Sequence, residues 1–210
     1  MLAARNLERL KAAVAELDSS TALALQCDVT SPASVEKMWA AAVEWQGGID
    51  ICVNNSGVGA NGVPSAELSF DDWNRIMSTN VNGVFLCAQQ ALKHMIPKKA
   101  GKILNIGSIS AQMSRANALP YTTSKFAVEG MTRSLALDAR QHGIEVSVLH
   151  PGNAETAIFG LNLDNAKTNE GMMEPADVAQ VAVTIVSAPQ GTNVLSSIVL
   201  PTRQPYLGRG

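Results

Sequence analysis

The chain alternates short runs rich in β-branched, apolar residues with longer segments of helical periodicity, and this alternation restricts its fold more than any other feature. Predicted strands cover Ala22–Cys27, Ile49–Asn54, Lys102–Gly107, Glu145–Leu149 and Leu195–Leu200. Predicted helices cover residues 32–46, 70–96, 121–142 and 175–187. Apolar strands that alternate with helices predict a doubly wound α/β fold, in which helices cover both faces of a parallel sheet. We expect one domain over residues 1–210.

Residues typical of helix ends support several of these boundaries. Ser31-Pro32 offers an N-cap and a proline for the first helical turn, and Glu174-Pro175 places a proline likewise in the last helix. Gly143 follows the third predicted helix at the position where glycine commonly ends a helix. The stretch Pro151–Met173 is too long for a plain connection, so we predict a lid or substrate loop there.

The composition is typical of a soluble globular protein. The 210 residues are 46% hydrophobic and 16% charged, with a formal net charge of −2. The chain has no basic run and no apolar segment approaching about 18 residues, so we predict neither a nucleic-acid partner nor a membrane span. The N-terminus lacks the pattern of a secretory signal, which favours a cytoplasmic protein. Cys27, Cys52 and Cys87 lie in apolar stretches without metal-ligand spacing, which predicts buried, reduced thiols and no metal site.

Tyr121 and Lys125 form the most informative pair of polar residues. They are four positions apart in a predicted helix and therefore lie on the same face. A neighbouring ammonium favours phenolate and would bring the tyrosine pKa down from about 10 toward the working pH, as a general acid/base requires. The same spacing also fits an amphipathic helix whose lysine extends into solvent, so the pair alone does not decide between the two.

Polar residues and glycines follow three of the predicted strands. The sequences are Asn54-Asn55-Ser56-Gly57-Val58-Gly59, Gly107-Ser108-Ile109-Ser110 and His150-Pro151-Gly152. In a parallel α/β sheet, ligands bind at the carboxyl ends of the strands, where glycines let the backbone approach a ligand closely. The predicted helix with Tyr121 begins soon after Ser108, so we expect these two side chains to share one rim of the sheet. The residues His94, His142 and His150 are scattered, and we interpret them as structural or exposed.

Six short motifs follow one another along the chain. They are Asp28-Val29, Asn54-Asn55-Ser56-Gly57, Asn80, Ser108, Tyr121 with Lys125, and Pro151-Gly152 followed by Thr156. Their order and spacing, with Ser108 thirteen residues before Tyr121, resemble the single-domain form of the short-chain dehydrogenase/reductase family from residue 1 to about residue 200. The resemblance implies a Rossmann-like fold and an NAD(P)-dependent oxidoreductase that acts on a ketone or a secondary alcohol.

The resemblance also implies a role for each catalytic residue. Tyr121 would give a proton to a carbonyl oxygen or take it from an alcohol, and Ser108 would hydrogen-bond the same oxygen. Lys125 would lower the phenol pKa and hold the nicotinamide ribose. Asn80 would hold a water that links Lys125 to solvent. Ser110 is the alternative to Ser108, but the spacing to Tyr121 favours Ser108.

The cofactor preference is predicted from one position near the N-terminus. Family members that prefer NAD carry an acidic residue at the end of their second strand, where this chain has Ala4 followed by Arg5. Arg5 could pair with a 2′-phosphate, so we expect NADP(H), with NAD as the alternative; a solvated arginine at a helix start is the other interpretation. The expected cofactor-binding residues are Arg5, Asp28, Val29, Asn54, Ser56, Gly57, Tyr121, Lys125, Pro151, Gly152 and Thr156.

The sequence also departs from the family pattern. It opens at what resembles the end of the second family strand, followed by a helical pattern at Leu7–Leu17, and it contains no first strand, glycine-rich turn or first helix. That turn normally holds the cofactor pyrophosphate. The absent strand is central in the family sheet, so we expect unpaired strand edges and uncovered apolar surface. We expect an incomplete or misannotated reading frame that begins at an internal methionine; a genuinely shortened protein is the alternative, and it could be a non-catalytic homologue that acts as a binding or oligomerisation partner.

The resemblance further implies a homodimer or homotetramer that assembles through the long helical segments 79–96 and 121–142. The substrate would be selected by Gln112–Leu119 and by the loop after Gly152. Apolar residues in these segments predict a fairly apolar pocket for a small molecule, and they are Ala116, Ala118, Leu119, Ile158, Phe159, Leu161 and Leu163.

Overall fold

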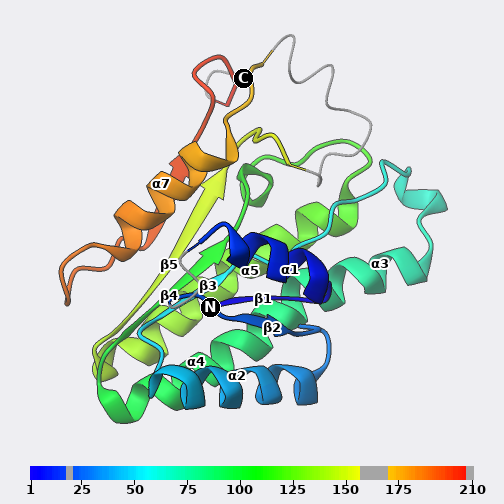
Figure 1. Ribbon diagram of the computed structural model, residues 1–210. Helices are drawn as coiled ribbons and strands as arrows, with labels where there is room; N and C mark the ends of the chain where they lie inside the picture. The colour runs from blue at the N-terminus through cyan, green and yellow to red at the C-terminus, as the bar shows by residue number, and fades with distance from the viewer. Residues whose placement is uncertain (18–20, 157–169, 207–210) are drawn as a thin grey trace.

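The computed structural model describes residues 1–17, 21–156 and 170–206. Within these ranges six parallel strands form two sheets (Figure 1). The smaller sheet pairs β1 (Leu2–Ala4) with β2 (Ala24–Gln26). The larger sheet has the order β3 (Ile51–Asn54), β4 (Gly101–Ile106), β5 (Ile144–Pro151) and β6 (Ser196–Val199). All five predicted strands are present, with ends that differ from the predictions by at most two residues.

Helices connect successive strands. They are α1 (Leu7–Ala15), α2 (Pro32–Gln46), α3 (Phe70–Met77), α4 (Gly83–Lys98), α5 (Leu119–Ala139) and α7 (Pro175–Val186). The Ser31 hydroxyl accepts a hydrogen bond from the Ser34 amide at 3.3 Å and caps α2, as its sequence predicted. A short 3₁₀ turn, Arg140–His142, follows α5, and Gly143 with φ of 67° ends the helical segment.

The prediction of one helix over residues 70–96 was wrong in one respect. Helix α3 and helix α4 are separated by a π-helical turn at Ser78–Asn82. A π turn carries an extra residue per turn, and it is common at functional sites. Helical periodicity runs through the segment, so the sequence pattern alone did not reveal the change of winding.

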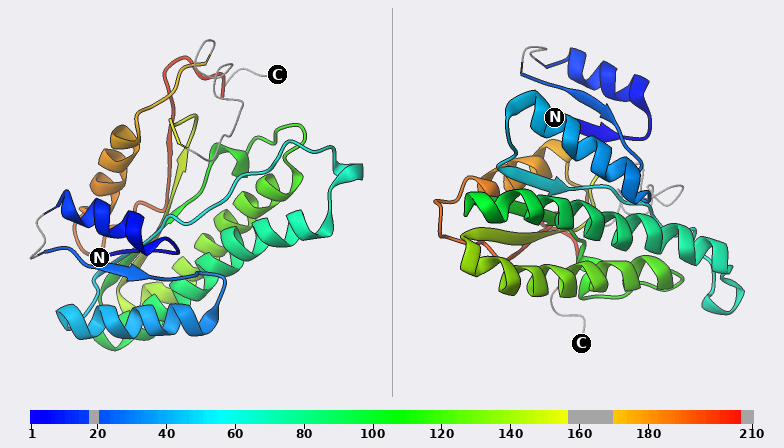
Figure 2. Two further views of the ribbon diagram at one scale, coloured as in Figure 1. Left: turned by 45° about the vertical axis from the view of Figure 1, so that its right-hand side comes forward. Right: turned by 90° about the horizontal axis from the view of Figure 1, so that it is seen from below.

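Helices cover both faces of the larger sheet, which confirms the doubly wound fold (Figures 1 and 2). On one face, side chains from β4 and β5 such as Ile103 and Val146 pack with α2, α4 and α5 in the main apolar core. On the other face, Leu104 and Leu149 pack against Ile185 of α7. Alternation along each strand therefore buries both faces of β4 and β5, because successive side chains point to opposite sides.

The two sheets are separated between β1 and β3. Within the described residues no strand pairs with the free edge of either strand at this place. Ile51 and Val53, on the face of β3 away from the main core, are 45% and 48% exposed. The unpaired edges and uncovered apolar surface that the sequence predicted are both present at this position in the sheet.

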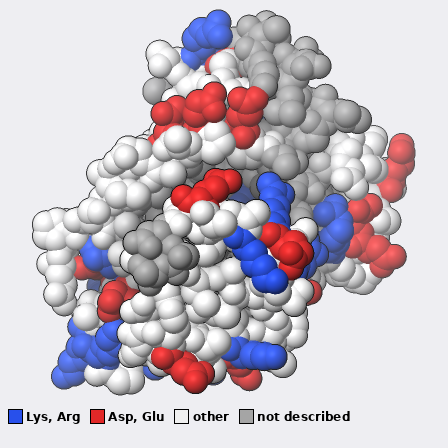
Figure 3. Space-filling model, in the orientation of Figure 1, with Lys and Arg blue, Asp and Glu red and all other residues white. Residues whose placement is uncertain are grey.

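The surface carries charges of both signs without a basic stripe on the face shown in Figure 3. No described helix is both long enough and apolar enough to cross a membrane. Helices and strands together bring the carboxyl ends of β3, β4 and β5 to one rim, and the sequence-predicted site residues follow these ends.

Candidate active site

Ser108 lies two residues after the end of β4. Its backbone is extended, with φ of −173°, and it caps the 3₁₀ turn Ile109–Ala111. The Ser108 hydroxyl accepts a hydrogen bond from the Ser110 amide at 3.1 Å, which leaves the hydroxyl hydrogen free to donate elsewhere. Ser110 itself is 4% exposed, and its backbone amide holds the Ser108 hydroxyl. The geometry therefore favours Ser108 over the alternative, Ser110, as the residue that faces a reacting group.

Tyr121 lies in the first turn of α5, close enough to Ser108 for that side chain to influence its pKa. Burial is the largest influence on its pKa and raises it, while the hydrogen bond from Ser108 and the nearby cation of Arg115 lower it. Together these influences place the pKa of Tyr121 above 10.0. We had expected the pKa of Tyr121 to fall under the influence of Lys125, and that expectation was wrong for the free protein.

Lys125 is 5% exposed, one helical turn after Tyr121. Its Nζ lies 5.5 Å from the centroid of the Tyr121 ring and donates a hydrogen bond to the Ile106 carbonyl at 3.0 Å. Burial lowers the pKa of Lys125 from 10.5 to about 8. The ammonium thus lies over the face of the phenol ring and against the end of β4, and its loss of hydration dominates its acid–base behaviour.

Asn80 lies in the π-helical turn and is 1% exposed. Its side-chain oxygen accepts from the Val58 amide at 2.8 Å, and its Nδ2 donates to the Val58 carbonyl at 2.9 Å and to the Ser124 hydroxyl at 3.1 Å. The side chain therefore ties the loop after β3 to α5. The predicted role of Asn80 in a water relay from Lys125 stays a prediction.

The loop after β5 is held by a residue that the sequence did not single out. The Gln204 side-chain oxygen accepts from the Asn153 amide at 2.8 Å, and a Cβ at Gly152 would overlap that oxygen. Glycine at 152 is therefore required by this close approach. The buried Asn153 also accepts a hydrogen bond from Nη2 of Arg115 at 2.9 Å, which links this loop to the segment before α5.

The remaining predicted cofactor residues lie at the ends of β1, β2, β3 and β5. Arg5 is exposed, and Asp28 accepts from the Thr30 amide and hydroxyl at 2.9 and 2.8 Å. Val29 packs against Gly83, where a Cβ would come within 2.7 Å of the valine side chain.

The other residues of the predicted set differ in how far they face solvent. Asn54 is buried, and its Nδ2 donates to Asn105 Oδ1 at 2.8 Å, so its side chain serves to join β3 and β4. Ser56 and Thr156 are exposed. Gly57 and Pro151 are partly buried.

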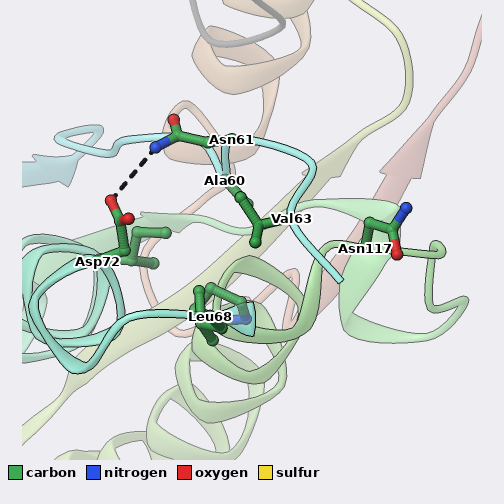
Figure 4. A pocket seen from close by; sticks show the side chains of 8 residues that line it. Ala60, Asn61, Val63, Leu68, Asp72 and Asn117 are labelled. Atoms are coloured by element: carbon green, nitrogen blue, oxygen red, sulfur yellow. Dashed lines mark hydrogen bonds between the residues drawn. The ribbon is translucent and has the colours of Figure 1, made fainter. Parts of the chain in front are cut away.

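A small cavity lies between the loop after β3 and the segment before α5 (Figure 4). Ala60, Val63 and Leu68 line it, and Asn61 Nδ2 donates to Asp72 Oδ1 at 3.2 Å at its edge. Its volume of about 10 Å³ is room for about one water molecule, so it is not a substrate pocket. Of the apolar residues predicted to select the substrate, Ile158, Phe159, Leu161 and Leu163 lie outside the described residues.

Comparison with known proteins decides the family. The profile of the short chain dehydrogenase family matches residues 1–166. The chain belongs to the short-chain dehydrogenase family. Its members are NAD(P)-dependent oxidoreductases. The motifs on which the resemblance was based all lie within the matched range.

Several curated relatives and solved structures are similar to the chain. It is 39% identical over 154 residues to a gluconate 5-dehydrogenase from Gluconobacter oxydans, covering 72% of this chain and 60% of that protein. It is 34% identical over 180 residues to glucose 1-dehydrogenase 2 from Bacillus subtilis, covering 79% of this chain and 68% of that protein. The chain thus spans about three fifths of the length of the first of these relatives.

The structural matches extend over nearly the whole chain. The closed form of a serine dehydrogenase complexed with NADP+ superposes with a TM-score of 0.89 at 27% identity, covering 99% of this chain and 87% of that one. A gluconate 5-dehydrogenase from Burkholderia cenocepacia, in complex with NADP and tartrate, has a TM-score of 0.86 at 28% identity and covers 95% of this chain and 83% of that one. These values confirm the Rossmann-like fold.

Proposed function

We propose that the chain transfers a hydride between NADP(H) and a ketone or secondary alcohol, with Tyr121 as general acid/base. The observation that carries this proposal is that Ser108, Tyr121 and the buried Lys125 meet at the carboxyl end of β4, with the Lys125 ammonium 5.5 Å from the centroid of the phenol ring and bonded to the Ile106 carbonyl. In the reduction direction Tyr121 gives its proton to the carbonyl oxygen, and Ser108 donates a hydrogen bond to that oxygen as negative charge develops on it.

The raised pKa of Tyr121 suits the reduction direction in the free protein. A phenol whose pKa lies above its ordinary value is protonated at neutral pH and can act as the acid. For alcohol oxidation the phenolate is required, and the groups that favour it are Ser108 and Arg115. Activity in the oxidation direction should therefore rise with pH.

The hydrogen-bond donors of Lys125 indicate whether this site fits the ribose of a bound nicotinamide nucleotide. Its ammonium has three hydrogens, and within the described part of the chain one of them is used, by the Ile106 carbonyl. The other two are available to ribose hydroxyls at the rim, and a buried ammonium gains most from such partners. When bound, the cofactor supplies or accepts the hydride, while the protein orients it.

The other contacts are proposed from the position of each residue. Arg5 would hold a 2′-phosphate, which favours NADP over NAD, in keeping with the NADP complexes of the serine and gluconate dehydrogenases. Asp28 and Val29 would contact the adenine. Pro151, Gly152 and Thr156 would lie along the nicotinamide side, and Ser56 with Gly57 would approach the cofactor through the backbone.

The experiment that tests the function is turnover by wild type and Tyr121→Phe, followed by the absorbance of NADPH. Gluconate and serine lead the panel of alcohols, because relatives are named for them. We expect NADP reduction by wild type and at least a hundredfold lower rate for Tyr121→Phe with unchanged NADPH binding. Equal rates for the two proteins would refute the role of Tyr121.

A non-catalytic binding or oligomerisation partner is the alternative function, and the family match does not favour it. A chain with unpaired strand edges can act as a binding or oligomerisation partner without turnover. Fluorescence titration with NADPH separates the two functions, since binding weaker than millimolar would exclude the enzyme for this chain and support the second candidate.

We also propose a homo-oligomer that assembles through α4 and α5, and a cytoplasmic location. Phe85, Phe126 and Leu137 on these helices are 47%, 48% and 60% exposed, which is unusual for large apolar side chains. Among the described residues, Cys27 and Cys87 are buried free thiols, whereas Cys52, predicted to be buried, is only partly buried; free thiols suit a reducing compartment. Size-exclusion chromatography tests the assembly, and a monomer at micromolar concentration would count against it.

A further inference from the structure

His150, in β5, lies against the end of the neighbouring strand β4 and contacts the Ser108 backbone. The parallel register pairs Ile106 with Leu149, which brings the next residues, Gly107 and His150, side by side. The His150 side chain is 0% exposed. A Cβ at Gly107 would lie 2.5 Å from His150 Nδ1 and 2.7 Å from its Cε1, so only glycine leaves room for the imidazole.

The imidazole joins two elements through its two nitrogens. Nδ1 is 3.2 Å from the Ser108 amide nitrogen and 2.9 Å from the Ser108 carbonyl oxygen. Nε2 is 2.7 Å from Oε2 of Glu129 in α5. A buried histidine with partners on both sides has a fixed ring orientation, and its tautomer is set by the hydrogen bonds it makes.

The hydrogen bonds around Ser108 determine which tautomer fits. The Ser108 carbonyl already accepts from the Ala111 amide at 2.9 Å, whereas the Ser108 amide has His150 Nδ1 as its one hydrogen-bond acceptor among the described residues. With the proton on Nε2, Nδ1 accepts from the Ser108 amide and Nε2–H donates to the Glu129 carboxylate, whereas a proton on Nδ1 would point to the Ser108 carbonyl and leave the Ser108 amide without this acceptor.

Glu129 completes the link back to the helix that carries Tyr121. It lies eight residues, or about two turns, after Tyr121 in α5. Burial raises the pKa of its carboxyl group, but hydrogen bonds from Arg133 and His150 outweigh burial and hold the pKa below 4.5. Glu129 is therefore a carboxylate at neutral pH, with Oε1 at 2.6 Å from Arg133 Nε and Oε2 on His150.

We propose that Glu129 and His150 are positioning residues that hold the Ser108 backbone, and with it the Ser108 hydroxyl, at a fixed distance from Tyr121. The inference rests on the proposed oxidoreductase function. Ser108 is then joined to the helix that carries Tyr121 through His150 and Glu129. Neither positioning residue contacts the reacting atoms; they act by limiting how far Ser108 can move when charge develops on the substrate oxygen.

Two substitutions of His150 separate its two hydrogen bonds. In His150→Asn the side-chain oxygen can take the place of Nδ1 and accept from Ser108, but the contact with Glu129 is lost. In His150→Gln the side-chain amide can take the place of Nε2 and donate to Glu129, but the acceptor for Ser108 is lost. Arg133→Gln is the matched control, because it removes the exposed partner of Glu129 and leaves His150 intact.

Steady-state kinetics at a temperature well below unfolding give the first readout. We expect His150→Gln and Glu129→Gln to lower kcat about tenfold with little change in the KM for NADP(H). Removing a hydrogen-bond donor to the developing negative charge lowers kcat roughly a hundredfold, and displacing the Ser108 hydroxyl should cost part of that effect. His150→Asn should retain more kcat than His150→Gln, and Arg133→Gln should resemble wild type. A folded His150→Gln with wild-type kcat, or equal losses in all four variants, would overturn the proposal.

The imidazole NMR spectrum gives a second readout that does not depend on turnover. The chain has three histidines, so the signals of His150 can be assigned by their loss in His150→Asn. We expect a proton on Nε2 and none on Nδ1, and a proton on Nδ1 would overturn the hydrogen-bond assignment. A wild type without any turnover would instead refute the proposed function, while the tautomer would still test the link between Ser108 and Glu129.

Discussion

Replacing the buried Lys125 by methionine should stabilise the fold while it abolishes activity. Lys125 is 5% exposed, and burial lowers its pKa from 10.5 to about 8. At about 1.4 kcal/mol for each pKa unit, keeping this ammonium in the folded state at neutral pH costs roughly 3 kcal/mol. Methionine has a similar length and no charge, so Lys125→Met removes this cost.

The gain is offset in part by a lost hydrogen bond. The Ile106 carbonyl accepts from Lys125 Nζ at 3.0 Å, and loss of such a bond costs about 1 kcal/mol. We therefore expect Lys125→Met to raise the free energy of unfolding by about 2 kcal/mol at pH 7. For a chain of 210 residues this corresponds to about 4–8 °C in Tm.

The stability difference between wild type and Lys125→Met should change with pH in a defined direction. The unfolded state binds a proton on Lys125 up to the ordinary pKa of 10.5, and the folded state releases it from about 8. Wild-type stability should therefore rise between pH 8 and 10.5 relative to the variant, because the unfolded state binds more protons in that window. The advantage of Lys125→Met should be full below pH 8 and disappear toward pH 10.5.

Urea unfolding of wild type and Lys125→Met at pH 7 and pH 10 measures both quantities, with the slope m as a check that the same surface unfolds. Lys37→Met, at an exposed position of α2, is the control for removing a lysine charge and should change little. A Lys125→Met protein that is less stable than wild type at pH 7, or an advantage that does not shrink at pH 10, would refute the argument that lost hydration dominates this site.

Three further predictions concern the other groups around the site and the outer helix face. Arg115→Gln should raise the Tyr121 pKa further, because Arg115 is one of the groups that lower it, so the pH at which alcohol oxidation reaches half its maximal rate should move upward; an unmoved profile would contradict this. Gly107→Ala should lower the free energy of unfolding by about 1–3 kcal/mol and reduce kcat, because the added methyl group meets an imidazole at 2.5 Å. Its control is Gly130→Ala in α5, which meets nothing within 4 Å and should be neutral or stabilising in thermal unfolding. Phe126→Glu should shift the protein to a smaller species in size-exclusion chromatography with the far-UV circular dichroism unchanged, and an unchanged elution volume would place the contact between copies elsewhere.

The sequence was most informative where the signal is local. Ser31-Pro32 predicted the start of α2 and Gly143 the end of the α5 segment, because caps and left-handed glycines act on their nearest neighbours. The change from α to π winding at Ser78–Asn82 was not predictable from the same kind of pattern. The buried residue of this turn, Asn80, makes its hydrogen bonds to Val58 and Ser124, 22 and 44 residues away.

The candidate site shows the same division. The spacing of Ser108, Tyr121 and Lys125 was enough to predict that they meet at the end of β4. It was not enough to predict the direction of the Tyr121 pKa, because burial by distant segments outweighs the neighbouring charge. The role of Asn54 as a cofactor contact stays a prediction, and the sequence did not reveal that its side chain joins β3 to β4 through Asn105, 51 residues away.

The sequence by itself determined the strand–helix alternation, the family and the order of the motifs, since these follow from local periodicity and from residue identity. Only the tertiary structure decided how the site is supported. Gly107, Glu129 and His150 lie on three different elements, and their contact depends on the register of β4 with β5 and on the packing of α5 over the sheet. Hydration and hydrogen bonding at buried groups depend on every segment packed around them, and no local pattern records that packing.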